Sequence, residues 1–282
     1  MKYIVNFSGG LCSFWAAHRS IERHGKENVV LLFADTLIED GDLYDFNRHA
    51  ETVLGIPITR ICVGLKPWEL FEREGLIGNN RFPICSTKLK REPLNEWMAS
   101  HYEMEPNQNN AFYEPATVVL GFDWTEHYRV EEFQAEHPAW RVEAPMTEEP
   151  IWDKCRMRKE SEQLGFKVPR LYQLGFPHNN CGGGCVRAGI SHWVHLHRTL
   201  PEVFTQWEQA ELKGMAALQS RGIEPMSMLK DRRGGEAVTL TLAMLRTRIE
   251  AGEKLPKHDW GGCGCGGASG TVPGAEAEGG TK

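Results

Sequence analysis

The sequence lacks a long hydrophobic run. Apolar residues make up 41% of its 282 residues, but stretches such as Val29–Ala34 are far too short to cross a bilayer. The first ten residues, MKYIVNFSGG, contain one lysine, a short strand-like run and then glycines, without the apolar core or the small-residue cleavage site of a signal peptide. These absences exclude a membrane-spanning class and predict a cytoplasmic protein.

An excess of positive charge is also absent. The chain has 32 Lys and Arg residues against 38 Asp and Glu residues, a net charge of −6 at pH 7. This balance gives no general attraction to nucleic acid, although a basic patch can exist within an acidic total. The only dense basic turn is Lys230-Asp231-Arg232-Arg233, for which a solvated loop is the default and contact with nucleic-acid phosphate the alternative. The sequence is compatible with a homo-oligomer.

Strand-like and helical patterns alternate along the chain. Strand-like runs cover residues 3–7, 29–34, 56–63 and 116–122, and apolar spacing typical of helices covers 11–24, 43–54, 89–100 and 147–165. Strands separated by helices of this length favour a parallel sheet. The expected fold class is therefore α/β, a Rossmann-like (HUP-type) parallel sheet with helices on both faces.

The last third of the chain has a different pattern. Beyond Gly189 it reads as entirely helical, over 190–198, 201–219 and 239–251. Residues 266–282 are Gly, Ala, Ser and Glu with a single large aliphatic residue, so we do not expect them to order themselves. We predict a nucleotide-binding domain over 1–188, a helical region over 189–265 and a tail over 266–282.

A glycine-rich loop follows the first predicted strand. Ser8, Gly9, Gly10, Leu11, Cys12 and Ser13 lead directly into a helix, where glycines let the backbone approach a ligand and the first-turn amides bind phosphate. No lysine follows, so this is not the nucleoside-triphosphate loop that ends in Gly-Lys-Ser/Thr. On the glycines alone, a plain strand-to-helix turn explains the pattern equally well.

Five motifs in order resemble one family. SGGLCS resembles the PP-loop of the N-type ATP pyrophosphatases, and four further blocks are similar to the phosphoadenosine-phosphosulfate reductase branch, which includes sulfurtransferase-like proteins of DNA phosphorothioation. These blocks are Phe33–Thr36, Cys85–Leu94, Gly121–Arg129 and Leu171–Cys181. The resemblance implies a nucleotide-binding fold across residues 3–187.

Three departures from the family pattern bear on the activity. Cys12 replaces the usual acidic residue of the loop, and Asp123 stands where reductases carry an arginine. The C-terminal Glu-Cys-Gly block of the redox-active reductases is absent; Trp260-Gly261-Gly262-Cys263-Gly264-Cys265 stands there instead. The resemblance therefore implies nucleotide binding more firmly than sulfonucleotide reduction.

Several residues outside the loop are candidates for the site. Asp35 and Thr36 follow the second strand, where ligands of open α/β sheets bind, and Gly121 lies near the end of the strand predicted at 116–122. Lys90 and Arg129 would neutralise phosphate or a leaving group, and His178 is a further catalytic candidate. The alternatives are an N-capping Asp35 and solvated ion pairs for the two cations. Trp124 and Trp260 flank these motifs and are expected at the pocket.

The eight cysteines include two close pairs in glycine. Cys181 and Cys185 lie four residues apart, and Cys263 and Cys265 two apart; together they match the ligand count of a tetrahedral zinc site or an iron–sulfur cluster. The resemblance favours a [4Fe–4S] cluster and makes Cys85 the rival ligand. Thiols without metal, or a reversible disulfide between the pairs, remain open.

The remaining three cysteines are expected to be structural. Cys62 lies in an apolar strand and is predicted to be in the core, and Cys155 lies in a helix. Cys12, at a helix N-terminus, is either a packing residue or a reactive thiolate.

These observations predict an enzyme that takes a small-molecule nucleotide, ATP or a sulfonucleotide, together with an acceptor that the sequence does not identify. The favoured activity is ATP-dependent adenylation or sulfur transfer with a cysteine-bound cluster. The alternatives are a reductase of phosphoadenosine or adenosine phosphosulfate, and a non-enzymatic nucleotide- or metal-binding module.

Overall fold

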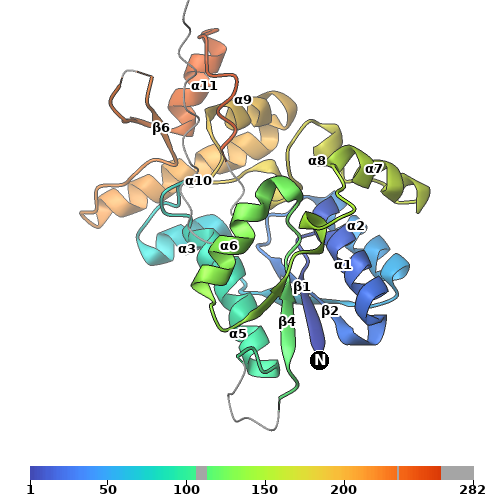
Figure 1. Ribbon diagram of the computed structural model, residues 1–282. Coiled ribbons are helices and arrows are strands. Elements are labelled where there is room, and N and C mark those ends of the chain that lie inside the picture. Colours follow the sequence, from blue (N-terminus) through green and yellow to red (C-terminus); the bar gives the residue numbers. More distant parts are fainter. Residues whose placement is uncertain (106–112, 234, 262–282) are drawn as a thin grey trace, which may run out of the picture.

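A computed structural model describes residues 1–105, 113–233 and 235–261 (Figure 1). Its main sheet has five parallel strands in the order β3-β2-β1-β4-β5. The strands are β1 (Lys2–Asn6), β2 (Val29–Asp35), β3 (Ile58–Cys62), β4 (Ala116–Val119) and β5 (Arg141–Glu143). The chain builds outward from β1 on one side and then returns to the other side through β4. This order confirms the predicted α/β, Rossmann-like fold class.

Helices cover both faces of the sheet, as predicted. Neighbouring residues of β1 show why: Val5 packs with α1 (Leu11–His24) and α2 (Gly41–Leu54), whereas Ile4 packs with α5 (Glu92–His101) and α6 (His127–Glu136). Both side chains are fully buried, as expected for a parallel strand that has a helical layer on each side.

The expected helix over 147–165 begins later than predicted. Its regular part is α7 (Lys154–Gln163), and the side chain of Asp153 caps it by accepting a hydrogen bond from the backbone N–H of Arg156. Residues before Asp153 include Pro150, which cannot donate a helical hydrogen bond. The helix predicted at 89–100 is present as the π-helical turn η2 (Thr87–Arg91) followed by α5, and a short helix that was not predicted, α4 (Ile84–Ser86), precedes them.

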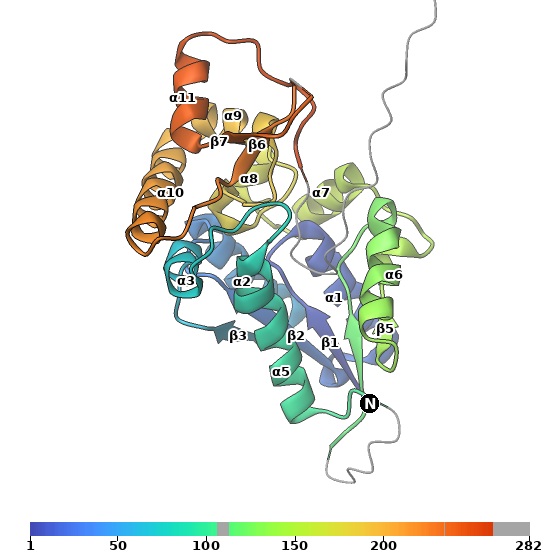
Figure 2. The same ribbon diagram turned by 90° about the vertical axis from the view of Figure 1, so that its left-hand side faces the viewer.

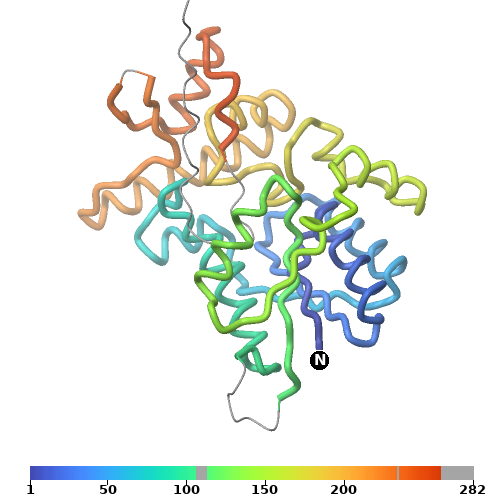
Figure 3. The backbone as a smooth tube through the Cα atoms, viewed as in Figure 1, coloured from blue at the N-terminus to red at the C-terminus, as the bar shows by residue number. Residues whose placement is uncertain are grey.

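The region after Gly189 is not entirely helical. It contains α9 (Ile190–Thr199), α10 (Pro201–Ser220) and α11 (Leu242–Glu250), but an antiparallel hairpin of β6 (Leu229–Asp231) and β7 (Val238–Leu240) precedes α11. These helices lie beyond the carboxyl ends of the sheet strands, at the top of Figure 1 and Figure 2. Figure 3 shows the described chain returning at its red end toward the segment before α9, where Gly261 forms a β-bridge with Ala188.

The C-terminal helices share a hydrophobic core with residues that precede the predicted boundary at 188. Phe71 of α3 (Pro67–Glu74), Ile77, and Leu171 of α8 (Arg170–Gln173) pack in one buried cluster with Trp193 and Phe204. The boundary at residue 188 therefore stays a prediction. The short 3₁₀ turns are η1 (Lys26–Asn28), η3 (Trp124–Glu126), η4 (Pro145–Thr147) and η5 (Cys181–Gly183). In the part of the chain that is described, no helix is long and apolar enough to cross a membrane.

Candidate nucleotide site

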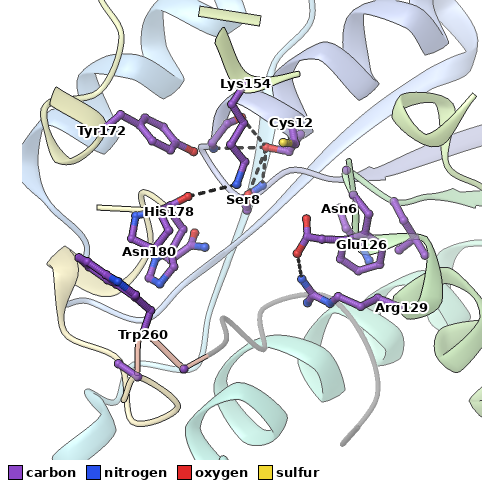
Figure 4. A pocket seen from close by; sticks show the side chains of 18 residues that line it. Asn6, Ser8, Cys12, Glu126, Arg129, Lys154, Tyr172, His178, Asn180 and Trp260 are labelled. Carbon is purple, nitrogen blue, oxygen red and sulfur yellow. Dashed lines mark hydrogen bonds and ion pairs between the residues drawn. The ribbon is translucent and has the colours of Figure 1, made fainter. Parts of the chain in front are cut away.

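A cavity of about 270 Å³ lies at the carboxyl ends of β1 and β4, where the strand order reverses direction (Figure 4). Ligands of open α/β sheets bind at this place, because the loops of the two strands diverge there. The cavity is bordered by the loop after β1, by the segment from Gly121 to Arg129, and by residues of α7 and of the chain after α8. Its lining includes Ser8, Gly10, Cys12, Ser13, Gly121, Glu126, Arg129, Lys154, Tyr172, His178, Asn180 and Trp260.

The glycines of the loop are required by close contacts. Gly9 has a φ of +74°, and a Cβ atom there would lie 2.8 Å from Cγ of Leu43. A Cβ atom on Gly10 would lie 2.9 Å from the hydroxyl oxygen of Tyr172. A side chain at either position would therefore displace the loop from α2 or from Tyr172.

The Ser13 hydroxyl holds the loop in shape. It donates a hydrogen bond to the carbonyl oxygen of Gly10 at 2.9 Å and accepts from the backbone N–H of Ser8 at 3.2 Å. Asn179 also holds the loop, since its side-chain amide donates a hydrogen bond to the carbonyl oxygen of Gly9 at 3.0 Å. The loop is thus bound to its own helix and to the segment before η5.

The amino end of α1 faces the cavity. Its first turn contains no acidic residue, so no carboxylate of that turn occupies the end of the helix where anions bind. The backbone N–H of Leu11 lies 3.4 Å from the Tyr172 hydroxyl. The helix terminus, two serines and a tyrosine hydroxyl therefore offer hydrogen-bonding groups toward the same cavity.

Two cations border the cavity. Arg129 is buried, forms an ion pair with Glu126 and lies over the ring of Phe122 at 4.2 Å from its centroid. Lys154, at the start of α7, is half-exposed; its Nζ atom lies 3.7 Å from Asp123 Oδ2 and donates to the carbonyl oxygen of Pro177 at 3.3 Å. Arg129 was expected here, and Lys154 was not.

Burial decides the protonation of two groups in the lining. The pKa of His178 is lowered to about 3, chiefly because the ring is buried, so the imidazole is neutral at physiological pH. The pKa of the Cys12 thiol is raised to about 12, again chiefly by burial. Of the two interpretations of Cys12, the structure therefore favours packing, and the thiol lies 3.8 Å from the sulfur of Met157.

Asp35, Thr36 and Lys90 lie elsewhere. The buried carboxylate of Asp35 accepts hydrogen bonds from Arg60 Nε at 2.8 Å and from the Tyr44 hydroxyl at 2.9 Å. Thr36 and Lys90 line a second, small cavity of about 20 Å³, where Lys90 Nζ lies 3.1 Å from Glu39 Oε1. The structure therefore does not bring these three predicted residues into the lining of the cavity at the ends of β1 and β4.

Three cysteines line that second cavity. Cys85, Cys181 and Cys185 border it, and Lys90 Nζ lies 3.6 Å from the Cys181 sulfur. Cys181 has a φ of +57°, a conformation that non-glycine residues rarely adopt. Cys263 and Cys265 lie outside the described residues. Within those residues, no three His, Cys, Asp or Glu side chains are grouped so as to hold a metal ion.

Cys62 and Cys155, both expected to be structural, are exposed to solvent. Cys62 is exposed and not in the core, because β3 is the edge strand of the sheet. Cys155 lies in α7 as expected for a helix, but it is also exposed.

Sequence reasoning missed several lining residues. Asn6 ends β1, Tyr172 and Asn180 lie within a motif that was noticed for other residues, and Lys154 sits in a charged helix where a lysine gives no signal. Trp260 does line the cavity, as expected. Trp124 is about half-exposed at 52% and is not part of the lining.

Comparison with known proteins finds similar solved structures but no match by sequence. No family model and no curated protein matches the sequence. Among solved structures, the phosphoadenylyl-sulfate (PAPS) reductase from Candida auris, in a phosphate complex, is similar at 15% identity and a TM-score of 0.39, covering 61% of this chain and 78% of that chain. The strand order of the sheet establishes the α/β fold independently of this match.

Proposed function

We propose that the chain binds ATP or a related adenine sulfonucleotide in the cavity at the ends of β1 and β4 and catalyses adenylation or sulfur transfer to an acceptor. The observation that carries the proposal is the Ser8–Ser13 loop at the point where the strand order reverses, with the amino end of α1 directed into a cavity bordered by two cations. The order of the motifs along the sequence supports the same assignment.

In this proposal the loop binds the phosphates. Backbone N–H groups of the first turn of α1 and the hydroxyl of Ser8 donate to phosphate oxygens, while Ser13 keeps the loop in shape. Lys154 and Arg129 neutralise the charge that collects on the leaving pyrophosphate, for which the planar guanidinium of Arg129 offers two parallel hydrogen bonds.

The adenylation step is a displacement at phosphorus. A nucleophilic oxygen of the acceptor attacks the α-phosphorus of ATP, forming a new P–O bond while the bond to the bridging oxygen breaks and pyrophosphate leaves with the bonding electrons. For sulfur transfer, a sulfur donor then displaces AMP from the activated acceptor. The proton of an attacking hydroxyl leaves with the pyrophosphate. With its pKa lowered to about 3, His178 is too weak a base to accept that proton, and its neutral imidazole would instead orient the acceptor by a hydrogen bond.

Pyrophosphate release tests the proposal. The wild-type chain should release pyrophosphate from ATP in the presence of a suitable acceptor, and Ser13→Ala should lose most of this activity because the loop loses its internal ties. Ser20→Ala is the matched control: Ser20 lies in the same helix, and its hydroxyl donates only to the Ala16 carbonyl, away from the cavity.

Other outcomes identify the alternatives. Sulfite release from a sulfonucleotide with a thiol donor, without pyrophosphate release, would identify a reductase. Nucleotide binding without either product would identify a binding module and overturn the enzyme assignment.

We also propose that the paired cysteines hold a metal. Cys181 and Cys185 would act with Cys263 and Cys265, with Cys85 as the rival ligand; thiolates of this number suit zinc or an iron–sulfur cluster. The cavity between Cys85, Cys181 and Cys185 has room for one small occupant. As described, these three side chains are not grouped so as to hold a metal, so both an ion and a cluster require them to move. Bound, such a group would supply structural order, electrons or sulfur.

Metal analysis after anaerobic purification distinguishes these groups. Iron with acid-labile sulfide and visible absorption, both lost in Cys181→Ser, would support a cluster. Stoichiometric zinc in colourless protein would support the ion. Cys155→Ser, an exposed cysteine on α7, serves as the control.

A further inference from the structure

A third cavity, of about 660 Å³, borders the nucleotide cavity. Its walls come from the loop around Arg81 and Phe82, from the β6–β7 hairpin and from the segment that ends at Gly261. Ala188 and Gly261 belong to the linings of both cavities. The partition between the two is therefore the single β-bridge formed by these residues.

The charge of this groove is opposite to that of the whole chain. Five basic residues line it, against the acidic residues Asp231 and Asp259; the basic ones are Arg81, Arg187, Lys230, Arg232 and Arg233. Asp231 pairs with Arg233 at 2.7 Å and with Arg248 at 2.5 Å, and Arg233 also pairs with Glu253 at 2.8 Å. Asp259 accepts a hydrogen bond from the backbone N–H of Ile190 at 3.0 Å and keeps its charge. A net positive surface remains on a protein whose net charge is −6.

Three of the basic side chains are exposed and available to a ligand. Arg81, Lys230 and Arg232 are exposed, and none makes an ion pair with another residue of the described ranges. Long cations that lie near one another without carboxylate partners repel one another, which a polyanion in the groove would relieve.

An aromatic ring stands beside these cations. Phe82 is 42% exposed, and the guanidinium of Arg81 lies 5.3 Å from the centroid of its ring. Buried Asn79 fixes the backbone that carries Arg81 and Phe82, because its side-chain oxygen accepts hydrogen bonds from the backbone N–H groups of Arg81 at 2.9 Å and of Phe82 at 3.0 Å. A fixed exposed ring among cations is the combination that binds unpaired bases and their phosphates.

We infer that this groove binds a single-stranded nucleic acid, with phosphates on Arg81, Lys230 and Arg232 and a base stacked on Phe82. An acidic peptide would use the cations but has no planar base for the ring, so the exposed phenylalanine favours nucleic acid. Because the groove ends at the Ala188–Gly261 bridge, a bound strand lies one partition away from the nucleotide cavity. This inference goes beyond the proposed activity and does not depend on it.

Fluorescence anisotropy with labelled oligo(dT) and oligo(U), each twelve nucleotides long, tests the inference on the full chain. Binding should weaken as salt rises, with a slope of log K against log salt of roughly −2 from three phosphate contacts. Arg81→Glu, Lys230→Glu and Arg232→Glu combined should weaken binding more than tenfold. The matched control is Lys26→Glu, an exposed lysine at the opposite, amino edge of the sheet, which should leave binding within about twofold of wild type.

The aromatic residue separates nucleic acid from acidic protein. Phe82→Ala should weaken oligonucleotide binding about tenfold and Phe82→Trp should restore it, with no effect of either on the salt slope. Competition by poly-glutamate as effective as that by unlabelled oligonucleotide, together with an unchanged affinity in Phe82→Ala, would assign the groove to an acidic peptide instead. No oligonucleotide binding at low salt would overturn the inference. ATP binding and circular dichroism, measured on every variant, distinguish this failure from misfolding and from failure of the nucleotide site.

Discussion

Gly121 lies against the backbone of Ser13 so closely that a Cβ atom on Gly121 would be 2.6 Å from the Cα atom of Ser13. The end of β4 and the first turn of α1 are therefore in direct backbone contact at the place where the strand order reverses. This contact determines how closely the segment after β4 approaches the first turn of α1, and both segments line the nucleotide cavity.

Gly121→Ala should separate these two elements. We expect a loss of about 1–3 kcal/mol in the free energy of unfolding, as for an overpacked core, and weaker nucleotide binding. Urea denaturation and ATP titration measure the two effects. Gly41→Ala is the control, because nothing lies within 4 Å of its Cβ position; it should be neutral or stabilise the chain by up to about 1 kcal/mol. Equal effects of the two substitutions would contradict this account of Gly121.

Lys154→Met should weaken ATP binding about tenfold or more, because a charge-assisted hydrogen bond to phosphate is worth about 1.5–3 kcal/mol. Isothermal titration calorimetry measures the change. Lys159→Met, on an exposed position of the same helix, should leave the affinity unchanged. If both variants bind ATP as tightly as the wild type does, Lys154 does not contact the phosphates.

His178 should make the stability of the chain depend on pH. Its pKa is lowered to about 3 in the folded chain and is about 6.5 when unfolded, so below pH 6.5 the unfolded state binds a proton that the folded state does not. This residue therefore contributes a loss of stability as pH falls, at about 1.4 kcal/mol per pH unit, from 6.5 toward 3.

The His178→Asn variant tests that dependence. Its free energy of unfolding, measured in urea between pH 7 and 5, should fall less steeply with decreasing pH than that of the wild type. His258→Asn, which removes an exposed histidine, is the matched comparison. An identical pH slope in wild type and His178→Asn would show that the imidazole is not held neutral by burial.

Cys12 should resist alkylation in the folded chain. With its pKa raised to about 12, the thiol carries almost no thiolate at pH 8, whereas Cys62 and Cys155 are exposed. Iodoacetamide labelling followed by mass spectrometry should modify Cys62 and Cys155 first, and Cys12 only after unfolding in urea. Rapid labelling of Cys12 in the native chain would point to a reactive thiolate and reopen a catalytic role for it.

The sequence was most informative where a local pattern decides the structure. The boundaries of α1 were predicted from apolar spacing and a preceding Gly-Gly, and β2 from a run of branched and aliphatic residues, because these elements are specified by neighbours along the chain. The loop at Ser8–Ser13 was found for the same reason: strand, glycines and helix start are consecutive.

Contacts between distant residues could not be predicted in this way. Asp35 ends a strand at the correct edge of the sheet, but Arg60 and Tyr44 surround its carboxylate, and nothing near Asp35 in the sequence signals them. Lys154 lines the cavity only because α7 begins beside it. The β6–β7 hairpin was missed: its first strand overlaps the expected solvated loop at Lys230, and the helix predicted over 239–251 included the end of β7. Strands of three residues are too short to establish an alternating pattern.

The shared cluster of Phe71, Ile77, Leu171 and Trp193 has a consequence for how the chain opens. Amide groups of α3 and α9, more than a hundred residues apart, should exchange their hydrogens with solvent in one cooperative event, while those of β1 and β4 exchange more slowly in another. Residues of one buried cluster would then unfold together, even where they are far apart in the sequence. The partition between the nucleotide cavity and the basic groove would belong to the unit that opens first.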